Sequence, residues 1–434
     1  MKPHIELKYR TNGALPDAPY WETIIKDKSA ASGETHEDVA RLLARYAVPV
    51  WVTRAYAPAG ASWSPAEIAS GLDRIYRLVL QEDRAIPPEL VHDISLLPIV
   101  EYARIGRVGS AELPEPIPAQ MSVTTDLKSR RAVFLEEAQQ FTRGDPAVTV
   151  AILDTGIDLT HPELNGTLLP GRDFVDILDG ADKFLGDYLG ADEDPTDEVG
   201  HGTHVAGIVA GRGLAMPAGV VPRCKLLPVR VLGAMRQGER RVGAGLVDNI
   251  NVGIKWAVDQ GADVISMSLG VRHTDGGLPH QEVVEYAKQK GVTIVAAAGN
   301  DGTDQLYYPG ALPHVIAVGA EDDDGQVASY STWGAVTLVA PGTNVYSSYV
   351  GGDYAFSTGT SHATPFVSGG VAMLKSFARQ RGKPSLTDGQ VKHVLKHTAD
   401  KLDRSFRSKK AGFGRLNLYD ALRLLDFKLA HTLN

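Results

Sequence analysis

The sequence has 434 residues, with 44 basic and 52 acidic side chains that give a formal net charge of -8. The length predicts two or three globular domains, and the acidic balance argues against nucleic acid as the main partner, because phosphate binding requires a basic face. Its single cysteine, Cys224, excludes an intrachain disulfide and any cysteine-based zinc site. No apolar run approaches the roughly 18 residues of a transmembrane helix, so no membrane span is predicted.

The N-terminal residues 1–8 lack the apolar stretch of a secretory signal peptide. Together with the single cysteine, this favours a cytoplasmic protein. Secretion is the alternative if the sequence is a truncated form.

Glycine is the one skewed residue type, since 45 glycines make up about 10% of the chain against a usual ~7%. The hydrophobic content of 43% disfavours a disordered chain. The excess therefore predicts tight turns, and the positions of the glycines show where such turns lie.

Residues 1–45 predict a polar N-terminal extension that ends in a helix capped by Thr35. Residues 46–106 predict a small α+β unit. Its expected elements, in chain order, are a strand at 48–57, a helix from 64, a short helix at about 88–96 and a strand at about 99–105. The helix from 64 begins at the capping box Ser64-Pro65-Ala66-Glu67. Its apolar stripe is expected to contain Ile68, Leu72, Ile75, Leu78 and Val79.

Residues 107–129 predict a linker between this unit and the rest of the chain. Pro114, Pro116 and Pro118 exclude helix and central strand there and favour a stiff, extended segment.

Residues 130–434 predict an α/β domain, because apolar runs typical of buried parallel strands alternate with helical patterns. The runs lie at 147–153, 226–232, 263–268, 291–298 and 314–319, and the helices between them include 204–211, 245–259 and 281–290. This alternation predicts a parallel sheet with helices on both faces. Ligands of such sheets bind beyond the carboxyl ends of the strands.

Three glycine-rich segments place an acid, an imidazole and a hydroxyl where nucleophilic catalysis needs them. They are Asp154-Thr155-Gly156, Gly200-His201-Gly202 and Gly359-Thr360-Ser361. A serine hydroxyl is activated when a histidine takes its proton, and the histidine needs a carboxylate to fix its tautomer. Taken alone, an aspartate after a strand is more often a turn or helix cap; the three segments together favour catalysis.

The order aspartate, histidine, serine is that of subtilisin, and the whole pattern resembles the subtilisin-like serine protease family, the subtilases. Further resembling segments are Ile265–Gly270, Ala296–Asn300, Tyr308–Gly310, Ala340–Gly342 and Gly412–Asn417. The resemblance covers about 130–425. It implies a three-layer subtilisin-like fold with a mainly parallel central sheet, and serine endopeptidase activity through an acyl-enzyme intermediate.

The resemblance also implies a role for each matching residue. Ser361 is expected to be the nucleophile, His201 the general base and acid, and Asp154 the carboxylate that orients the histidine. Asn300 is expected to donate to the oxyanion. Extended substrate is expected to bind by strand addition, through Gly243, Ala244 and Gly245 on one side and through Ser268, Leu269, Gly270, Ala297, Ala298 and Gly299 on the other.

Subtilases are commonly made with an α+β propeptide that assists folding and inhibits the active site, and residues 46–106 resemble it in outline. The resemblance implies a self-inhibited precursor, with the N-terminal domain as intramolecular inhibitor and autocleavage between Ala103 and about Lys128. A permanent regulatory or partner-binding domain is the competing interpretation.

No cofactor is expected for the chemistry, and no metal ligand is assigned. The family's usual calcium loop follows the histidine helix, but residues 211–219 contain no acidic or asparagine residue, and Glu163 stands where an aspartate is usual. Structural calcium at that site is therefore doubtful. The acidic run 192–198 lacks the alternation of an EF-hand and favours a solvated loop over a calcium site.

His204 is expected to pack inside rather than bind metal. His362 stands where methionine is common in the family. It is interpreted as a tolerated substitution, with an effect on the pH profile as the alternative.

The leading hypothesis is a serine endopeptidase for protein or peptide substrates bound in extended form, with no nucleic-acid or membrane partner. A regulatory protease with one dedicated protein partner is an alternative. A catalytically silent peptide-binding scaffold is the other, and the complete set of expected catalytic residues argues against it.

Overall fold

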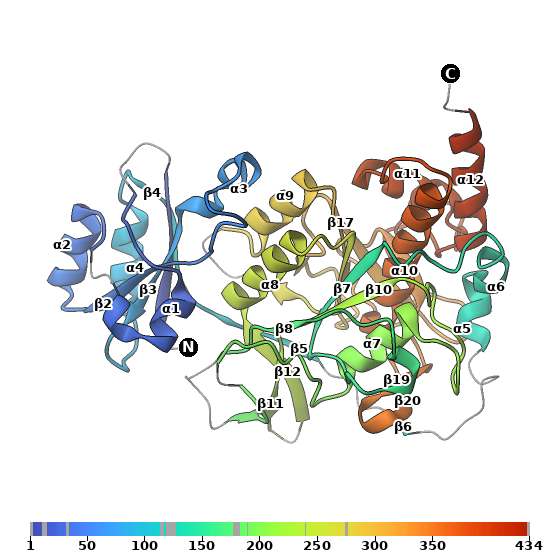
Figure 1. Cartoon of the computed structure of the whole chain (residues 1–434), viewed down its shortest axis with the longest axis horizontal. Coiled ribbons are helices and arrows are strands. Elements are labelled where there is room, and N and C mark those ends of the chain that lie inside the picture. Colours follow the sequence, from blue (N-terminus) through green and yellow to red (C-terminus); the bar gives the residue numbers. More distant parts are fainter. Residues whose placement is uncertain are drawn as a thin grey trace.

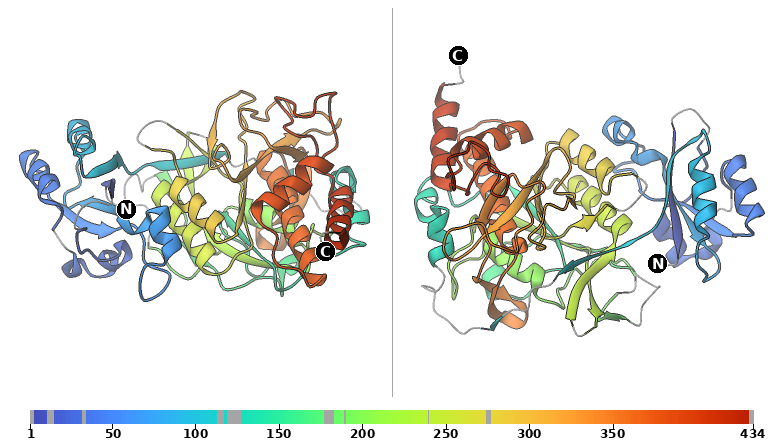
Figure 2. Two further views of the ribbon diagram at one scale, coloured as in Figure 1. Left: turned by 90° about the horizontal axis from the view of Figure 1, so that it is seen from above. Right: turned by 180° about the vertical axis from the view of Figure 1, so that it is seen from behind.

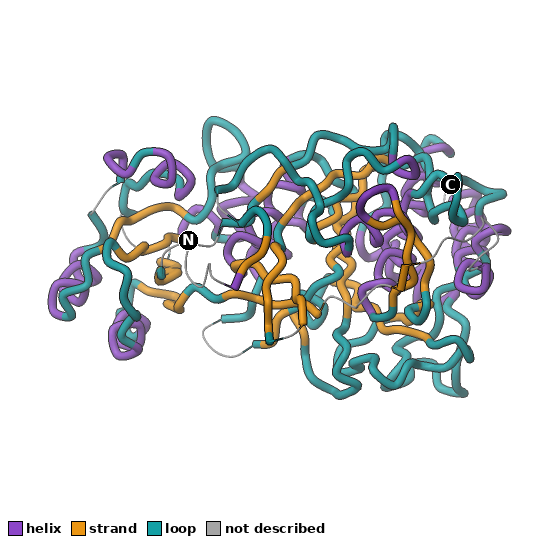
Figure 3. Tube along the Cα trace, turned by 90° about the horizontal axis from the view of Figure 1, so that it is seen from below, coloured by secondary structure: helices purple, strands orange, loops and turns teal. Residues whose placement is uncertain are grey.

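The computed structural model describes residues 3–10, 15–31, 34–112, 117–118, 127–176, 183–188, 190–238, 240–273 and 277–431. A smaller N-terminal unit, residues 3–105, lies beside a larger unit, residues 127–431 (Figure 1). In the Cα trace, the strands of the two units form separate groups (Figure 3). Among the described helices, none combines the length and hydrophobicity that crossing a membrane requires.

The smaller unit is built on a four-stranded antiparallel sheet in the order β2-β3-β1-β4. The strands are β1 (His4–Tyr9), β2 (Val50–Arg54), β3 (Ile75–Leu80) and β4 (Val100–Ile105). Helices α2 (Glu37–Arg45) and α4 (Pro88–Ser95) share one apolar core with this sheet. The expected boundary at residue 45 needs correction, because β1 is an inner strand of the sheet and residues 1–45 are no separate extension.

The apolar stripe expected on one helix from residue 64 is divided among three elements, so that expectation was wrong. The capping box is confirmed: Ser64 and Glu67 begin α3 (Pro65–Ser70). The helix ends at Gly71, whose φ of 77° lies in the left-handed region that favours glycine. A 3₁₀ turn, η2 (Leu72–Arg74), leads into β3, so Ile75, Leu78 and Val79 belong to a strand.

The larger unit contains a seven-stranded parallel sheet in the order β18-β17-β15-β13-β7-β10-β8. The strands are β7 (Thr149–Asp154), β8 (Arg172–Asp173), β10 (Lys225–Arg230), β13 (Val264–Met267), β15 (Thr293–Ala297), β17 (Val315–Glu321) and β18 (Leu338–Pro341). The predicted parallel α/β domain is confirmed.

Alternation along β7 explains the three layers of the larger unit. Val150 and Ile152 pack on one face with α7 (His201–Ala210), α10 (Thr360–Gln380), α11 (Asp388–Thr398) and α12 (Leu418–His431). Ala151 and Leu153 pack on the other face with α8 (Val247–Asp259) and α9 (Gln281–Gln289). The sheet therefore has a hydrophobic core on each side, as expected for parallel strands.

The remaining elements are short or lie outside the central sheet. The helices are α1 (Trp21–Lys26), η1 (Lys28–Ala30), α5 (Leu127–Ala132), α6 (Leu135–Ala138), η3 (Pro162–Leu164) and η5 (Val350–Gly352). The strands are β9 (Phe184–Leu185), β11 (Gly233–Gln237), β12 (Arg240–Leu246), β14 (Val271–Arg272), β16 (Tyr307–Tyr308), β19 (Val345–Tyr349) and β20 (Asp353–Ser357).

Two described segments of the expected linker, residues 107–129, are strands that pair with the larger unit, and its last residues, 127–129, already belong to α5. Pro114 and Pro116 lie outside the described residues. β5 (Val108–Glu112) is antiparallel to β12, and β6 (Ile117–Pro118) is antiparallel to β20. Figure 2 shows the cyan segment that contains β5 running from the smaller unit onto the larger one. β6 is an edge strand, a position that proline tolerates.

Buried polar contacts join the two units along α8 and α9. His4 Nε2 lies 2.5 Å from Asp248 Oδ2, and Lys8 Nζ donates to Glu282 Oε1 at 3.0 Å. Lys255 Nζ lies 2.8 Å from Glu67 Oε1. These charges are paired across the interface, as buried charges must be.

Candidate active site

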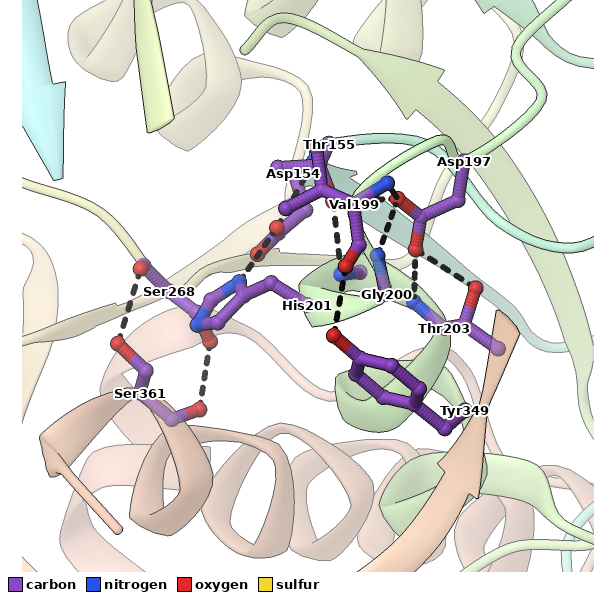
Figure 4. Close-up of polar contacts among 11 residues, drawn as sticks. Asp154, Thr155, Asp197, Val199, Gly200, His201, Thr203, Ser268, Tyr349 and Ser361 are labelled. Atoms are coloured by element: carbon purple, nitrogen blue, oxygen red, sulfur yellow. Dashed lines mark hydrogen bonds and ion pairs between the residues drawn. The ribbon is translucent and has the colours of Figure 1, made fainter. Parts of the chain in front are cut away.

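The three expected catalytic residues come from separate elements of the larger unit. Asp154 ends β7, His201 begins α7, and Ser361 lies in the first turn of α10. His201 Nδ1 lies 2.6 Å from Asp154 Oδ1, and both side chains are buried. In Figure 4 the imidazole lies between Asp154 and Ser361. The carboxylate is therefore positioned to hold the proton on Nδ1 and leave Nε2 as the base.

The Ser361 hydroxyl donates to the backbone carbonyl of Ser268 at 3.1 Å, and the Ser268 hydroxyl donates to the Ser361 carbonyl at 2.8 Å (Figure 4). His201 Nε2 is buried and has no hydrogen-bond partner among the described residues. The Ser361 hydroxyl is thus hydrogen-bonded to Ser268 and makes no hydrogen bond to His201 in this structure. Such looser contacts are common in catalytic sites without bound substrate.

Asn300 is oriented by Thr360. Its Oδ1 accepts hydrogen bonds from the Thr360 backbone N–H and hydroxyl, each at 2.9 Å. Because these bonds occupy the side-chain carbonyl, the amide N–H₂ is the group of Asn300 that remains to donate a hydrogen bond in the cleft. Asn300 and Ser361 both line this cleft.

A cleft of about 420 Å³ contains Ser361 and Asn300. The expected substrate-binding residues Ser268, Leu269, Gly270, Ala297 and Gly299 line it. Ala298 does not, because its side chain packs in a separate apolar cluster with Val336 and Val339.

The expected substrate strand, Gly243-Ala244-Gly245, lies on β12 and is already paired. Gly243 faces Ala111, Ala244 faces Ser110, and Gly245 faces Gly109 of β5. A Cβ on Gly109 would lie 2.4 Å from Val271 Cγ1, so glycine is needed for β5 to fit between β12 and β14. The chain's own β5 therefore pairs with the strand expected to bind substrate, and its residues Val108 and Gly109 line the cleft.

Comparison with known proteins decides the family. A family model described as Peptidase_S8, the subtilase family, matches residues 145–414. The chain belongs to the subtilase family. It is a subtilisin-like serine endopeptidase, a hydrolase whose substrates are proteins or peptides.

This subtilase is similar to proteases of several bacteria. It is 37% identical to the thermophilic serine proteinase of Bacillus sp. (strain AK1), over 67% of this chain and 65% of that protein. It is 37% identical to thermitase of Thermoactinomyces vulgaris, over 63% of this chain and 88% of thermitase. Among solved structures, the prenylagaramide maturation protease PagA matches with a TM-score of 0.55 and 30% identity, covering 67% of this chain and 98% of PagA.

The sequence analysis missed Asp197, which organises the loop before His201. Its carboxylate is buried and connects this loop to the end of β7. Asp197 lies in the acidic run 192–198 that was expected to be a solvated loop, and for this residue that expectation was wrong. Its position shortly before a helix start is the sequence feature that favours a capping role. The donors to Asp197 are Thr155 Oγ1, Val199 N, Gly200 N, Thr203 N and Thr203 Oγ1.

Two further histidines pack beside His201 in the subtilase core. His204 Nε2 donates to the carbonyls of Val345 and Ala355 at 3.0 and 3.1 Å, and burial lowers the pKa of His204 to about 3. The His362 ring lies 4.5 Å from the His204 ring and 5.5 Å from the His201 ring. Burial, followed by the two neighbouring histidines, holds the pKa of His362 well below its ordinary value. Both side chains therefore act as neutral packing groups.

The residues at the family's calcium loop do not fit a cation. The Glu163 carboxylate accepts hydrogen bonds from the successive backbone N–H groups of residues 213–216, at 2.6 to 3.2 Å. Those backbone groups are donors, whereas calcium requires oxygen ligands. Glu163 thus occupies the loop as its organising anion. Among the residues that the structure describes, no cluster of acidic, histidine or cysteine side chains forms a metal site.

Proposed function

We propose that this subtilase cuts extended peptides through Asp154, His201 and Ser361, with an acyl-enzyme intermediate. The observation that carries the proposal is the 2.6 Å contact between His201 Nδ1 and Asp154 Oδ1, with Ser361 and Asn300 lining the adjacent cleft. This combination supplies a nucleophile, a base, an orienting carboxylate and a donor to the oxyanion in one place.

In the first half of the reaction, His201 Nε2 accepts the Ser361 hydroxyl proton as Oγ bonds to the substrate carbonyl carbon. Negative charge develops on the carbonyl oxygen. The Asn300 amide and the Ser361 backbone N–H stabilise it, since first-turn helix amides have no intrahelical acceptor. Protonated His201, held by Asp154, then gives its proton to the leaving amine as the carbon–nitrogen bond breaks.

In the second half, water replaces the amine. His201 Nε2 takes a proton from water as the oxygen attacks the acyl carbon, and returns it to Ser361 Oγ as the ester bond breaks. The products are a carboxylic acid and the free hydroxyl of Ser361.

The smaller unit is, in this proposal, the intramolecular inhibitor of a precursor. The pairing of β5 with Gly243–Gly245 supports it, because a substrate segment would need the same backbone groups. Buried ion pairs along α8 and α9 support a stable contact between the units. Autocleavage is proposed in the segment from β5 to about Lys128, within the range expected from the sequence.

N-terminal sequencing and mass measurement of purified wild type and Ser361→Ala test both parts of the proposal. Wild type should show a new N-terminus between Ala103 and about Lys128, and Ser361→Ala should stay intact. A fluorophosphonate probe should label Ser361 only in the processed wild type. An identical intact chain in both preparations would reject autocleavage, and processed chain that takes up no label would reject the nucleophile.

A further inference from the structure

The side chain of Tyr307 fills the space between the two walls of the cleft beside the nucleophile. A Cβ on Gly299 would lie 2.7 Å from Tyr307 Cδ2 and 2.8 Å from Cε2. A Cβ on Gly270, in the other wall, would lie 3.2 Å from Tyr307 Cβ and 3.4 Å from Cδ1. The ring therefore touches the backbone of both walls, and little room remains between them at this level.

The ring is held in place by its hydroxyl group. Tyr307 Oη donates to Asp301 Oδ2 at 2.6 Å and accepts from Arg272 Nε at 2.9 Å. The Arg272 guanidinium also pairs with Asp301 and lies 5.4 Å from the Tyr307 ring centroid. β16, which carries Tyr307, pairs with β14, which carries Arg272. Moving the ring aside would break these polar contacts together.

The filled space is adjacent to the reacting groups. Gly299 precedes the proposed oxyanion donor Asn300, and Gly270 follows two residues after Ser268, whose carbonyl accepts from Ser361. Tyr307, Asn300 and Ser361 line the same cleft. Consider the substrate residue whose carbonyl group lies next to Ser361 Oγ and Asn300. Its side chain must point either between the walls that carry Gly299 and Gly270 or out to solvent.

We propose that Tyr307 determines the specificity of this subtilase, by restricting the residue on the acyl side of the cut bond to small side chains such as glycine, alanine and serine. The inference rests on the proposed function, because it needs Ser361 and Asn300 to hold the reacting carbonyl. The chain's own strand in the cleft carries such residues, with Gly109, Ser110 and Ala111 in succession. A larger side chain would have to displace the ring and its bonds to Asp301 and Arg272.

The test compares two peptides that differ only in the residue on the acyl side of the cut bond, alanine or phenylalanine. The enzyme is the full chain, allowed to process and titrated with a fluorophosphonate probe. Wild type should cut the alanine peptide with a kcat/KM at least about 10-fold higher, since a pocket that misfits by even one methylene costs roughly 10-fold or more. Tyr307→Ala should raise kcat/KM for the phenylalanine peptide by at least about 10-fold and change that for the alanine peptide much less.

Tyr307→Phe is the matched control, because it keeps the ring and removes only the hydroxyl. It should lower the preference for alanine less than Tyr307→Ala does, because the ring still occupies the space but has lost its hydrogen bonds to Asp301 and Arg272. Tyr307→Leu provides a second, smaller side chain if Tyr307→Ala does not fold, with the same direction of change expected.

Two outcomes would overturn the inference while the proposed function stands. The first is a wild type that labels normally but cuts after phenylalanine as well as after alanine. The second is a labelled Tyr307→Ala or Tyr307→Leu variant whose ratio of kcat/KM for the two peptides equals that of wild type. Folded, processed wild type that neither labels nor cuts any peptide would reject the proposed function itself, and the inference with it.

Discussion

Asp197 accepts two hydrogen bonds from Thr203, one from the backbone N–H at 2.9 Å and one from the hydroxyl at 2.7 Å. Its other oxygen accepts from Thr155 Oγ1 at 2.9 Å, and Thr155 follows the proposed orienting carboxylate, Asp154. One buried carboxylate thus joins the strand that ends at Asp154 to the helix that begins at His201. We expect the 2.6 Å contact between those two residues to depend on this connection.

Replacement of Asp197 by alanine should therefore impair both stability and catalysis. The buried donors around it would lose their acceptor, which costs about 1–3 kcal/mol for each group that water does not reach. We expect the free energy of unfolding to fall by about 2–4 kcal/mol and kcat/KM to fall at least about 10-fold as His201 loses its alignment. Urea unfolding and peptide hydrolysis measure the two effects.

Glu193→Ala is the matched control for Asp197→Ala, because Glu193 is an exposed acid of the same run. It should leave unfolding and kcat/KM close to wild type. If Asp197→Ala were as stable and as active as Glu193→Ala, the connecting role of Asp197 would be wrong.

The pH dependence of kcat/KM should have its acid limb above pH 6.5. Burial alone would lower the pKa of His201, but the charge of Asp154 and its hydrogen bond outweigh burial and raise the pKa above its ordinary value. Protonated His201 cannot accept the Ser361 proton, so the rate rises as the pH rises through this raised pKa. A pH–rate profile of processed enzyme measures the limb.

Asp154→Asn removes the charge that contributes most to raising the pKa of His201, and the smaller contribution of Asp197 remains. The residual activity of the variant should therefore have an acid limb at lower pH. Its kcat should also fall by about 10⁴-fold, as expected when the carboxylate of such a triad is lost. An acid limb of wild type below pH 6.5, or one that Asp154→Asn does not move, would contradict this role of Asp154.

Glu163 should replace calcium as the group that organises the loop at residues 213–216. Glu163→Gln weakens the acceptor of several backbone N–H groups and should lower the free energy of unfolding by about 2 kcal/mol or more. EDTA should shift the unfolding temperature of wild type and of the variant equally, or shift neither. Thermal unfolding with and without EDTA is the measurement, and Glu136→Gln, at an exposed position, is the control. A chelator that destabilised wild type but not Glu163→Gln would show that a cation binds there.

The contact between the two units should weaken as the pH rises from about 5 to about 8. Burial raises the pKa of Glu6 to about 8; Arg104 opposes this shift and Asp248 adds to it. Glu6 is therefore protonated at the interface at lower pH, and this stabilisation is lost as rising pH forces a second carboxylate beside Asp248. Limited proteolysis of uncut Ser361→Ala should show cleavage between the units that increases from about pH 5 to about pH 8 and then levels off, because the loss spans the range between the ordinary pKa of 4.5 and the raised pKa.

The matched comparison adds Glu6→Gln to the Ser361→Ala chain, because glutamine cannot ionise. The increase in cleavage between about pH 5 and pH 8 should be lost in this double variant. The same change at Glu37, which is exposed, should leave the increase intact. A Glu6→Gln chain that still loosens with rising pH would exclude Glu6 as the cause.

The expected catalytic residues could be placed from the sequence because each lies at the end of a strand or the start of a helix, beside glycine. β1 was missed although its sequence carries the local signal of a strand; what the sequence does not show is that both of its faces are buried. Its sequence alternates Ile5, Leu7 and Tyr9 with His4, Glu6 and Lys8, a pattern typical of a half-buried strand, yet all six residues are buried. The polar ones are buried against the larger unit, where they find charged partners, and that docking is invisible in the local sequence.

For β5 and Asp197, too, local sequence patterns do not show the contacts with residues far away in the chain. The prolines after β5 predicted an extended segment, and Pro114 and Pro116 lie outside the described residues; strand pairing between Val108–Glu112 and β12 joins residues far apart in the chain. Asp197 resembles its exposed neighbours in composition. Only the fold brings the hydroxyl of Thr155 to it. Local patterns therefore indicated the candidate catalytic residues, while the long-range contacts around them required the structure.

β5 and β6 attach the chain to the larger unit on both sides of residues 113–116, through β12 and β20. A cut between them would leave two new ends, each still held by its own strand pairing. The tether that keeps the smaller unit at an effective concentration on the order of mM would be gone, and inhibition would then depend on protein concentration and on the interface with α8 and α9. Dilution or destruction of the released unit, rather than the first cut, would decide when another protein can enter the cleft.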